Sequence, residues 1–105
     1  MIEIQEYIDV SGKSQFGRWY NKLDTQAALK IRTYLARIEA GNFSNTKSVG
    51  SGVLECKINY GPGYRVYFGK DGERLVILLG GGTKKRQSND IANATALWQQ
   101  YKTRR

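Results

Sequence analysis

The residue types best suited to chemistry are concentrated in two segments of alternating polarity, residues 53–60 and 64–70. The alternation predicts two β-strands of an antiparallel sheet. Because successive side chains point to opposite faces of a strand, Lys57, Arg65 and Tyr67 are expected to share one face. Folding does not require a lysine, an arginine and a tyrosine in the middle of a sheet face, so we predict that this face carries the functional site.

The turns between the strands predict their register, because the length of a hairpin loop fixes which residues face each other. A three-residue loop at Gly61-Pro62-Gly63 pairs Ile58 with Val66 and Cys56 with Phe68. A two-residue loop at Asp71-Gly72 then adds a third strand. On that register the same apolar, core-facing side carries Leu75, Ile77 and Leu79. The opposite, functional side pairs Lys57 with Tyr67, Asn59 with Arg65, and Glu55 with Gly69 and Arg74, and has a wall of Val76 and Leu78.

These residues match the needs of RNA cleavage without a metal, in which a base deprotonates the 2′-hydroxyl, cations stabilise the phosphorane and an acid protonates the leaving oxygen. Arg65 suits the phosphate because its planar guanidinium can bind two oxygens at once. Lys57 could act as the base if nearby cations and the apolar wall disfavour its ammonium form. Tyr67 could protonate the leaving oxygen or stack on a nucleobase.

Each assignment has a structural alternative. Glu55 could serve as the base, but a cross-strand ion pair is the favoured reading. Arg65 could be only a surface partner of Asn59, Lys57 an ordinary solvated lysine, and Tyr67 ordinary strand packing.

A second basic cluster follows the third strand, where Lys84, Lys85 and Arg86 come directly after three glycines and a threonine. Glycines allow the backbone to approach a ligand closely, and cations beside a helix start favour phosphate. The spacing does not fit a Walker A loop. We predict that these three residues, with Arg74, bind RNA phosphates, the alternative for the cluster being a solvated run of charge.

The composition agrees with a polyanionic partner. The chain has 105 residues, enough for one domain spanning residues 1–105, and a formal net charge of +8. Residues 1–40 hold six basic and five acidic side chains, whereas residues 41–105 hold eleven basic and four acidic ones. The excess positive charge therefore belongs to the second half of the chain, although it could serve solubility alone.

Residue types and segments that the sequence lacks also limit the chemistry that it can carry out. The chain contains no histidine, and Cys56 is its single cysteine, so the usual zinc, haem and Cys-His sites cannot be assembled. We expect no metal and no cofactor. Two glutamates in the first seven residues do not fit a secretory signal, and the longest aliphatic run, Leu75–Leu79, is too short to span a membrane. We therefore expect a cytoplasmic protein with no membrane partner.

Three helices are expected around the strands. After a short first strand at residues 2–7, apolar residues recur at helical spacing from Phe16 to Leu23, and Asp24 can cap a second helix that ends near Gly41. Residues 42–52 read as an exposed loop. Ser88 or Asn89 can cap a last helix, whose apolar stripe is Ile91, Ala94, Trp98 and Tyr101. We predict an α+β fold in which an antiparallel meander packs against an N-terminal helical hairpin, with Trp19, Trp98 and an inert Cys56 in the core.

The sequence resembles the bacterial RelE/ParE toxin superfamily, and in it the HigB-like branch of addiction module killer proteins. The resemblance covers nearly the whole chain. Its most specific parts are Leu54-Glu55-Cys56-Lys57, residues 61–68 from Gly61 to Phe68, Gly80-Gly81 before Lys84-Lys85, and Asp90-Ile91-Ala92.

This resemblance implies a RelE-like fold and the toxin of a type II toxin-antitoxin system. Such a toxin is an mRNA interferase, an endoribonuclease that inhibits translation, often by cutting mRNA on the ribosome. Its partners would be mRNA, the ribosome and a helix-turn-helix antitoxin. Arg65 resembles the family's strand arginine at the scissile phosphate, and Lys57 resembles a basic position on the preceding strand. Members often carry a C-terminal tyrosine or histidine for acid-base work, whereas a helix of ordinary core pattern is expected in that region here, which leaves the general acid unassigned.

Two other functions remain open from the sequence. One is a ParE-like toxin that poisons DNA gyrase through a protein interface, against which the Lys57 and Arg65 pair argues. The other is a relative that binds RNA without cutting it.

Overall fold

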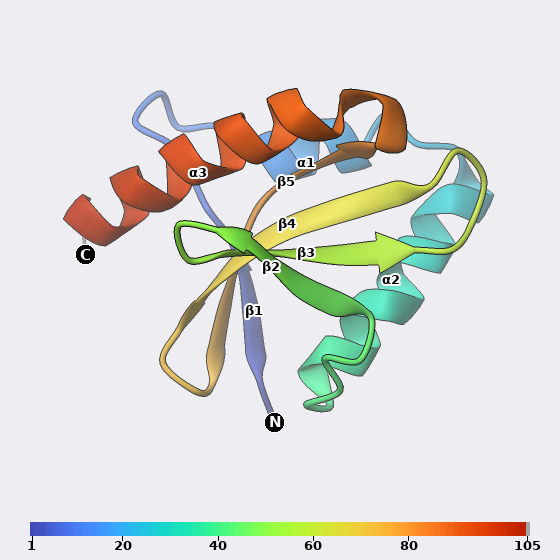
Figure 1. The fold of residues 1–105 in the computed structure, drawn as a ribbon, viewed down its shortest axis with the longest axis horizontal. Helices are drawn as coiled ribbons and strands as arrows, with labels where there is room; N and C mark the ends of the chain where they lie inside the picture. Colours follow the sequence, from blue (N-terminus) through green and yellow to red (C-terminus); the bar gives the residue numbers. More distant parts are fainter. Residues whose placement is uncertain (105) are drawn as a thin grey trace.

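The computed structural model describes residues 1–104, which form one five-stranded sheet with helices on both faces (Figure 1). Along the chain the elements are β1 (Glu3–Glu6), α1 (Gln15–Tyr20), α2 (Thr25–Glu39), β2 (Thr46–Gly50), β3 (Val53–Ile58), β4 (Tyr64–Asp71), β5 (Leu75–Thr83), the 3-10 turn η1 (Lys84–Arg86) and α3 (Gln87–Arg104). The strand order across the sheet is β1-β5-β4-β3-β2. The predicted α+β class is confirmed.

The predicted meander is present as β3, β4 and β5, and β1 extends it by pairing parallel to β5. The interpretation of residues 42–52 as a loop was wrong in part, because Thr46–Gly50 forms the edge strand β2 beside β3. The β2 sequence, TKSVG, does not alternate between apolar and polar residues. An edge strand pairs on one side only and buries little of its surface, so it needs no apolar face.

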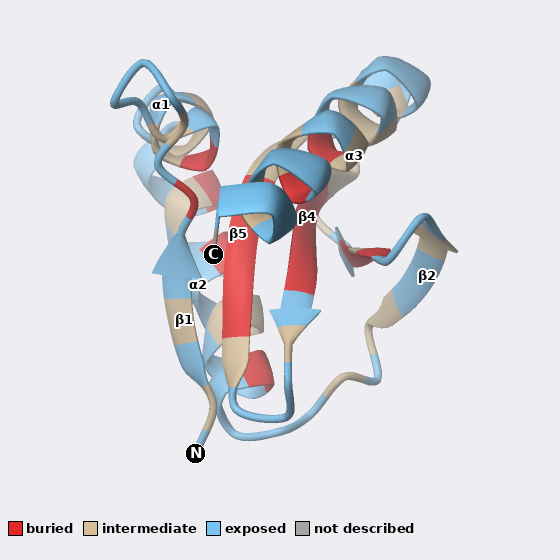
Figure 2. Ribbon diagram, turned by 90° about the vertical axis from the view of Figure 1, so that its left-hand side faces the viewer, coloured by how far each residue is buried: buried red, intermediate tan, exposed pale blue. Residues whose placement is uncertain are grey.

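The helices cover the two faces of the sheet, α1 and α2 on one face and α3 on the other (Figure 2). The N-cap of α2 is confirmed, since the Asp24 side chain accepts a hydrogen bond from the Ala27 amide at 2.9 Å. The N-terminal helices do not pack chiefly on each other as a hairpin, because α1 lies mainly against β5 and α2 against β3. The last helix begins at Gln87 as a continuation of η1, so neither Ser88 nor Asn89 is its cap.

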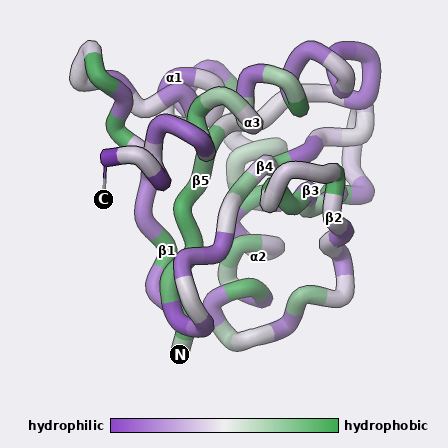
Figure 3. Tube along the Cα trace, turned by 60° about the vertical axis from the view of Figure 1, so that its left-hand side comes forward, coloured by the Kyte–Doolittle hydropathy of each residue, from purple (hydrophilic) through white to green (hydrophobic). Residues whose placement is uncertain are grey.

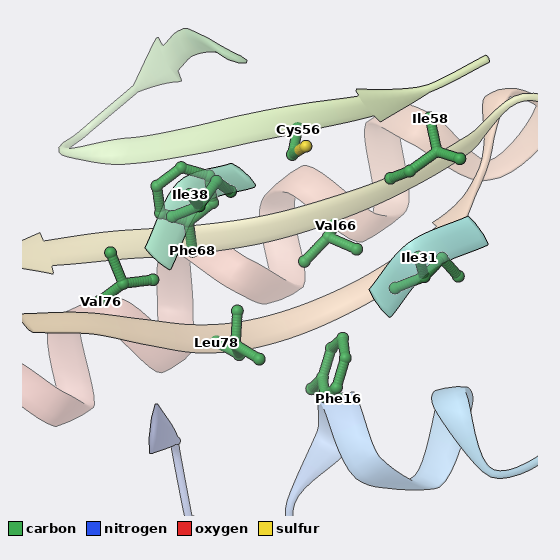
Figure 4. Packing of buried hydrophobic residues seen from close by; sticks show 9 residues of the cluster. All are labelled: Phe16, Ile31, Ile38, Cys56, Ile58, Val66, Phe68, Val76 and Leu78. Carbon is green, nitrogen blue, oxygen red and sulfur yellow. The ribbon is translucent and has the colours of Figure 1, made fainter. Parts of the chain in front are cut away.

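The core consists of two apolar clusters, one on each face of the sheet. The cluster under α1 and α2 is drawn in Figure 4 and contains Phe16, Ile31, Ile38, Cys56, Ile58, Val66, Phe68, Val76 and Leu78. The cluster under α3 contains Tyr7, Val53, Tyr67, Ile77, Leu79, Ala94 and Trp98. Both faces of the central strands are therefore buried, which explains why the hydrophobic colour is nearly continuous along β5 in Figure 3.

The register between β3 and β4 differs from the prediction by two residues. Cys56 pairs with Val66 and Ile58 with Tyr64, because the connection spans residues 59–63 rather than three residues. An even shift leaves every side chain on its predicted face. The apolar alternation therefore assigned the faces of these two strands correctly.

The register between β4 and β5 was predicted wrongly in a way that changes the faces. The turn spans residues 72–74 instead of two residues, so Asp71 pairs with Leu75 and Phe68 with Leu78. The predicted loop would have paired Phe68 with Leu75, so the register along Leu75–Leu78 differs by three residues, and an odd difference moves those side chains to the other face. The wall of Val76 and Leu78 therefore lies in the cluster under α1 and α2.

Within residues 1–104, no helix combines the length and the apolar character that crossing a membrane requires.

The location of Cys56 leads to a prediction about its reactivity. Its side chain is 1% exposed, and burial raises the pKa of the thiol to about 11. The thiolate is the reactive form, so we expect iodoacetamide at about pH 8 to modify the folded protein at least about 100-fold more slowly than the urea-unfolded chain. Mass spectrometry of the alkylated protein measures both rates, and comparable rates would show that the cluster under α1 and α2 opens readily.

Candidate functional site

Lys57 on β3 and Arg65 on β4 are directly opposite each other on the face of the sheet that α3 partly covers. Their environments differ, since Lys57 is exposed whereas Arg65 is 5% exposed. The expected neighbour of Arg65 was Asn59, and the two-residue shift in register places Lys57 there instead. The two cations thus share a face, with the amine at the surface and the guanidinium below it.

The Arg65 guanidinium is held from two sides. Its Nη1 donates a hydrogen bond to the Gly63 carbonyl at 2.6 Å, and its Nε lies 3.8 Å from Oε1 of Glu55. Glu55 is 1% exposed, and its Oε2 accepts a hydrogen bond from Nε2 of Gln87 at 2.8 Å. The favoured reading of Glu55 as half of an ion pair therefore holds, but its partner is Arg65 and not Arg74. This pair and Gln87 connect β3 and β4 to the first turn of α3.

Tyr67 is buried under α3, where a bound substrate could not contact it. It pairs with Glu55 in the ladder, is 0% exposed and packs with Trp98 and Ala94 of α3. Desolvation, followed by the charge of Glu55, raises the pKa of its phenol well above the usual range. Within residues 1–104 its hydroxyl makes no well-formed hydrogen bond, although the Glu55 carboxylate lies close enough to raise the pKa of the phenol. The geometry corresponds to the packing alternative, and the role of acid predicted for Tyr67 has no route to solvent in this conformation.

The basic residues after β5 lie at the same end of the sheet as Arg65. The Lys84 amide donates to the Gly63 carbonyl at 3.0 Å, so this carbonyl accepts from both Lys84 and Arg65. Lys84, Lys85 and Arg86 are all exposed. Lys57, Arg65 and Lys84 therefore converge around the β3–β4 connection, an arrangement that can bind a phosphodiester by charge-assisted hydrogen bonds.

Arg74 is not part of this group. It lies in the β4–β5 turn, at the opposite end of β4 from Arg65, where its carbonyl accepts a hydrogen bond from the Glu3 amide at 2.7 Å. Arg74 therefore lies apart from the other predicted phosphate-binding residues, and its own binding of RNA stays a prediction. The cause is again the longer turn, which moves Arg74 out of the sheet.

The three glycines of β5 mostly make room for side chains of the protein itself. A Cβ atom at Gly81 would lie 2.3 Å from the Trp19 ring, and one at Gly82 would lie 1.8 Å from Oδ2 of Asp90. Only Gly80 has open space where a side chain would start. The interpretation of the glycines as a phosphate cradle is thus corrected at two of the three positions.

Two residues of the site were missed by sequence reasoning, Gln87 and Asp90. Asp90 lies 3.9 Å from Nε of Arg86, its Oδ2 has no hydrogen-bond partner within residues 1–104, and burial raises its pKa. Gln87 carried no signal because a glutamine at a helix start is commonplace. The spacing of four residues between Arg86 and Asp90 could have indicated their pairing, since such residues are neighbours on a helix.

Comparison with known proteins gives one informative similarity. The chain is 40% identical over 94 residues to a protein of Haemophilus influenzae that is described only as an uncharacterized protein. The matched region covers 89% of this chain and 95% of that protein, so the likeness includes the whole candidate site. No family model matches the chain.

Proposed function

We propose that this chain, which belongs to the family of the Haemophilus influenzae protein, is a RelE-like toxin that cleaves mRNA without a metal. The observation that carries the proposal is the convergence of Lys57, Arg65 and Lys84 at one end of the sheet. A net charge of +8 favours a polyanionic substrate. The partners of such a toxin are mRNA on the ribosome and a helix-turn-helix antitoxin.

In this proposal Lys57 is the residue that meets the RNA first, because it is the exposed member of the pair. Its amine contacts the scissile phosphate and the attacking 2′-hydroxyl, while Lys84 and Lys85 bind neighbouring phosphates. Glu55 acts as a positioning residue for Arg65 rather than as the base, since its two oxygens already face Arg65 and Gln87.

Arg65 reaches the phosphate only when the first turn of α3 moves. The Glu55–Arg65 pair is buried, and one side-chain hydrogen bond joins Gln87, in the first turn of α3, to Glu55. A net hydrogen bond of this kind contributes about 0.5–1.5 kcal/mol, or up to about 3 kcal/mol with a charged acceptor, so binding of an RNA phosphate is strong enough to displace it. The guanidinium then takes the phosphate that Lys57 has captured.

The burial of Arg65 also favours a second candidate, an RNA-binding protein that does not cut. Both candidates use the exposed cations Lys57, Lys84 and Lys85. They differ in whether Arg65 ever meets the scissile phosphate, so detection of cleavage separates them.

Replacement of Lys57 by alanine tests the proposal without disturbing the core, because Lys57 is exposed. We expect brief expression of the wild type in a bacterial host to arrest growth and to produce discrete new 5′ ends in primer extension. Lys57→Ala should reduce those ends by about 100-fold or more, the usual loss when a proton-transfer or phosphate-binding group is removed.

The matched control is Arg32→Ala, which removes an exposed cation from the outer surface of α2. It should leave both the cuts and the growth arrest unchanged. Cuts that persist at wild-type level in Lys57→Ala would overturn the assignment, and salt-sensitive RNA binding without cuts in the wild type would favour the non-catalytic candidate.

A further inference from the structure

A groove of about 600 Å³ runs over β5 between α1 and α3. Figure 2 shows these two helices on either side of the end of β5. The floor of the groove is Leu79, Gly80 and Gly81. The groove shares Arg86 and Asp90 with the border of the candidate RNA site, but it runs along the side of β5 that does not pair with β4, so its function is a separate question.

The floor of the groove is an open strand edge. β1 pairs with β5 only at Leu75–Leu78, and the last hydrogen bond between them runs from the Tyr7 amide to the Leu78 carbonyl at 2.9 Å. Beyond that point the chain leaves the sheet, while β5 continues to Thr83 and pairs with β4. In the described part of the chain, Leu79–Thr83 thus has no strand on its outer side, and such an edge can accept another strand.

The surroundings of this edge select what can pair with it. Gly80 places no side chain in the groove, and a Cβ there would have no atom within 4 Å, so a backbone can approach closely. Three cations line the walls, namely Arg18 and Lys22 from the α1 side and Arg86 from η1. The one carboxylate, Asp90, lies beside Arg86. The groove is therefore cationic, with three basic side chains against one carboxylate in its lining.

We propose that this groove binds an extended acidic segment of a partner protein, which adds to the sheet as a strand along Leu79–Thr83. The unpaired amides and carbonyls of a strand edge repeat every second residue, which matches a peptide backbone. Acidic side chains of the added strand pair with Arg18, Lys22 and Arg86. This complementarity favours a peptide over RNA, whose bases and phosphates do not follow that repeat. The proposal stands independently of RNA cleavage.

The test uses a capped hexapeptide of alternating glutamate and valine as the probe, titrated into the ¹⁵N-labelled full-length protein. We expect saturable shifts of the backbone amides of Leu79–Thr83 and slower hydrogen exchange there. The same peptide with alternate amide nitrogens methylated cannot pair along one edge and should bind at least about 10-fold more weakly.

Two variants locate the binding. Gly80→Val fills the open space and should weaken binding at least about 10-fold, because a β-branched residue suits a strand and does not disturb β5 itself. Arg18→Glu combined with Lys22→Glu should do the same by charge repulsion. The matched control, Lys30→Glu with Arg32→Glu on the outer surface of α2, makes the same change in net charge and should bind as the wild type does.

Three results would overturn the proposal: no binding of the hexapeptide, equal binding of its methylated form, or unchanged binding to both groove variants. An octauridylate that shifts Leu79–Thr83 while the hexapeptide does not would assign the groove to RNA. None of these readouts depends on cleavage, so a failure here leaves the proposed function standing, and the reverse also holds.

Discussion

Glu55→Ala is expected to lower the free energy of unfolding by about 3–5 kcal/mol, the usual cost of removing one partner from a buried ion pair. Arg65 is 5% exposed, and without Glu55 its guanidinium keeps only the hydrogen bond to the Gly63 carbonyl. Gln87 also loses the acceptor of its side-chain amide. Urea unfolding followed by circular dichroism measures the change, with the slope of the transition checked for two-state behaviour.

The double variant Glu55→Leu with Arg65→Met is the control, because it removes both charges and retains most of the volume. Replacing a buried pair by apolar residues is often neutral, so the double variant should be more stable than Glu55→Ala alone. A loss below about 1 kcal/mol in Glu55→Ala would mean that water already reaches the pair. The first turn of α3 would then be open in the free protein, and RNA would not have to displace Gln87.

Much of this site follows from alternation along β3 and β4. Glu55 and Lys57 alternate along β3, and Arg65 and Tyr67 alternate along β4, so all four side chains lie on the same face of the sheet. An error of two residues in the pairing of the strands does not change that face. The sequence therefore indicated which side chains share a face before their partners were known. The same reasoning failed for Val76 and Leu78, because the β4–β5 turn is one residue longer than an Asp-Gly turn suggests.

The depth of the site could not be predicted in the same way. A continuous apolar run such as β5 is buried on both faces, and its pattern does not say which helix covers which face. The burial of Arg65 and Tyr67 depends on the position of α3, which in turn depends on the η1 turn and on contacts such as Gly82 with Asp90. The way α3 then lies over β3 and β4 depends on contacts between residues far apart in the sequence, such as Gln87 with Glu55, and no local pattern encodes them. The open edge of β5 was hidden for the same reason, since it exists only because β1 ends early.

Tyr67→Phe is expected to raise the free energy of unfolding by about 1–3 kcal/mol, which is the cost of a buried polar group without a partner. Within residues 1–104 the Tyr67 hydroxyl makes no well-formed hydrogen bond, and the nearby Glu55 carboxylate already faces Arg65 and Gln87, while the ring itself is packed in the cluster under α3. Phenylalanine keeps the ring and removes only the oxygen. Cleavage of RNA should be unchanged, because the phenol has no access to substrate and its raised pKa makes it a poor proton donor near neutral pH.

Stability and cleavage together decide between packing and catalysis for Tyr67. If the Tyr67 phenol protonates the leaving oxygen, Tyr67→Phe should lower RNA cleavage by about 100-fold or more, as expected for the loss of a general acid. In that case α3 would have to move far enough to uncover the cluster beneath it. A gain in stability with unchanged cuts in primer extension assigns Tyr67 to the core. The proton donor would then have to be an exposed group at the same end of the sheet, where the exposed Lys84 follows β5 and its amide bonds to the Gly63 carbonyl.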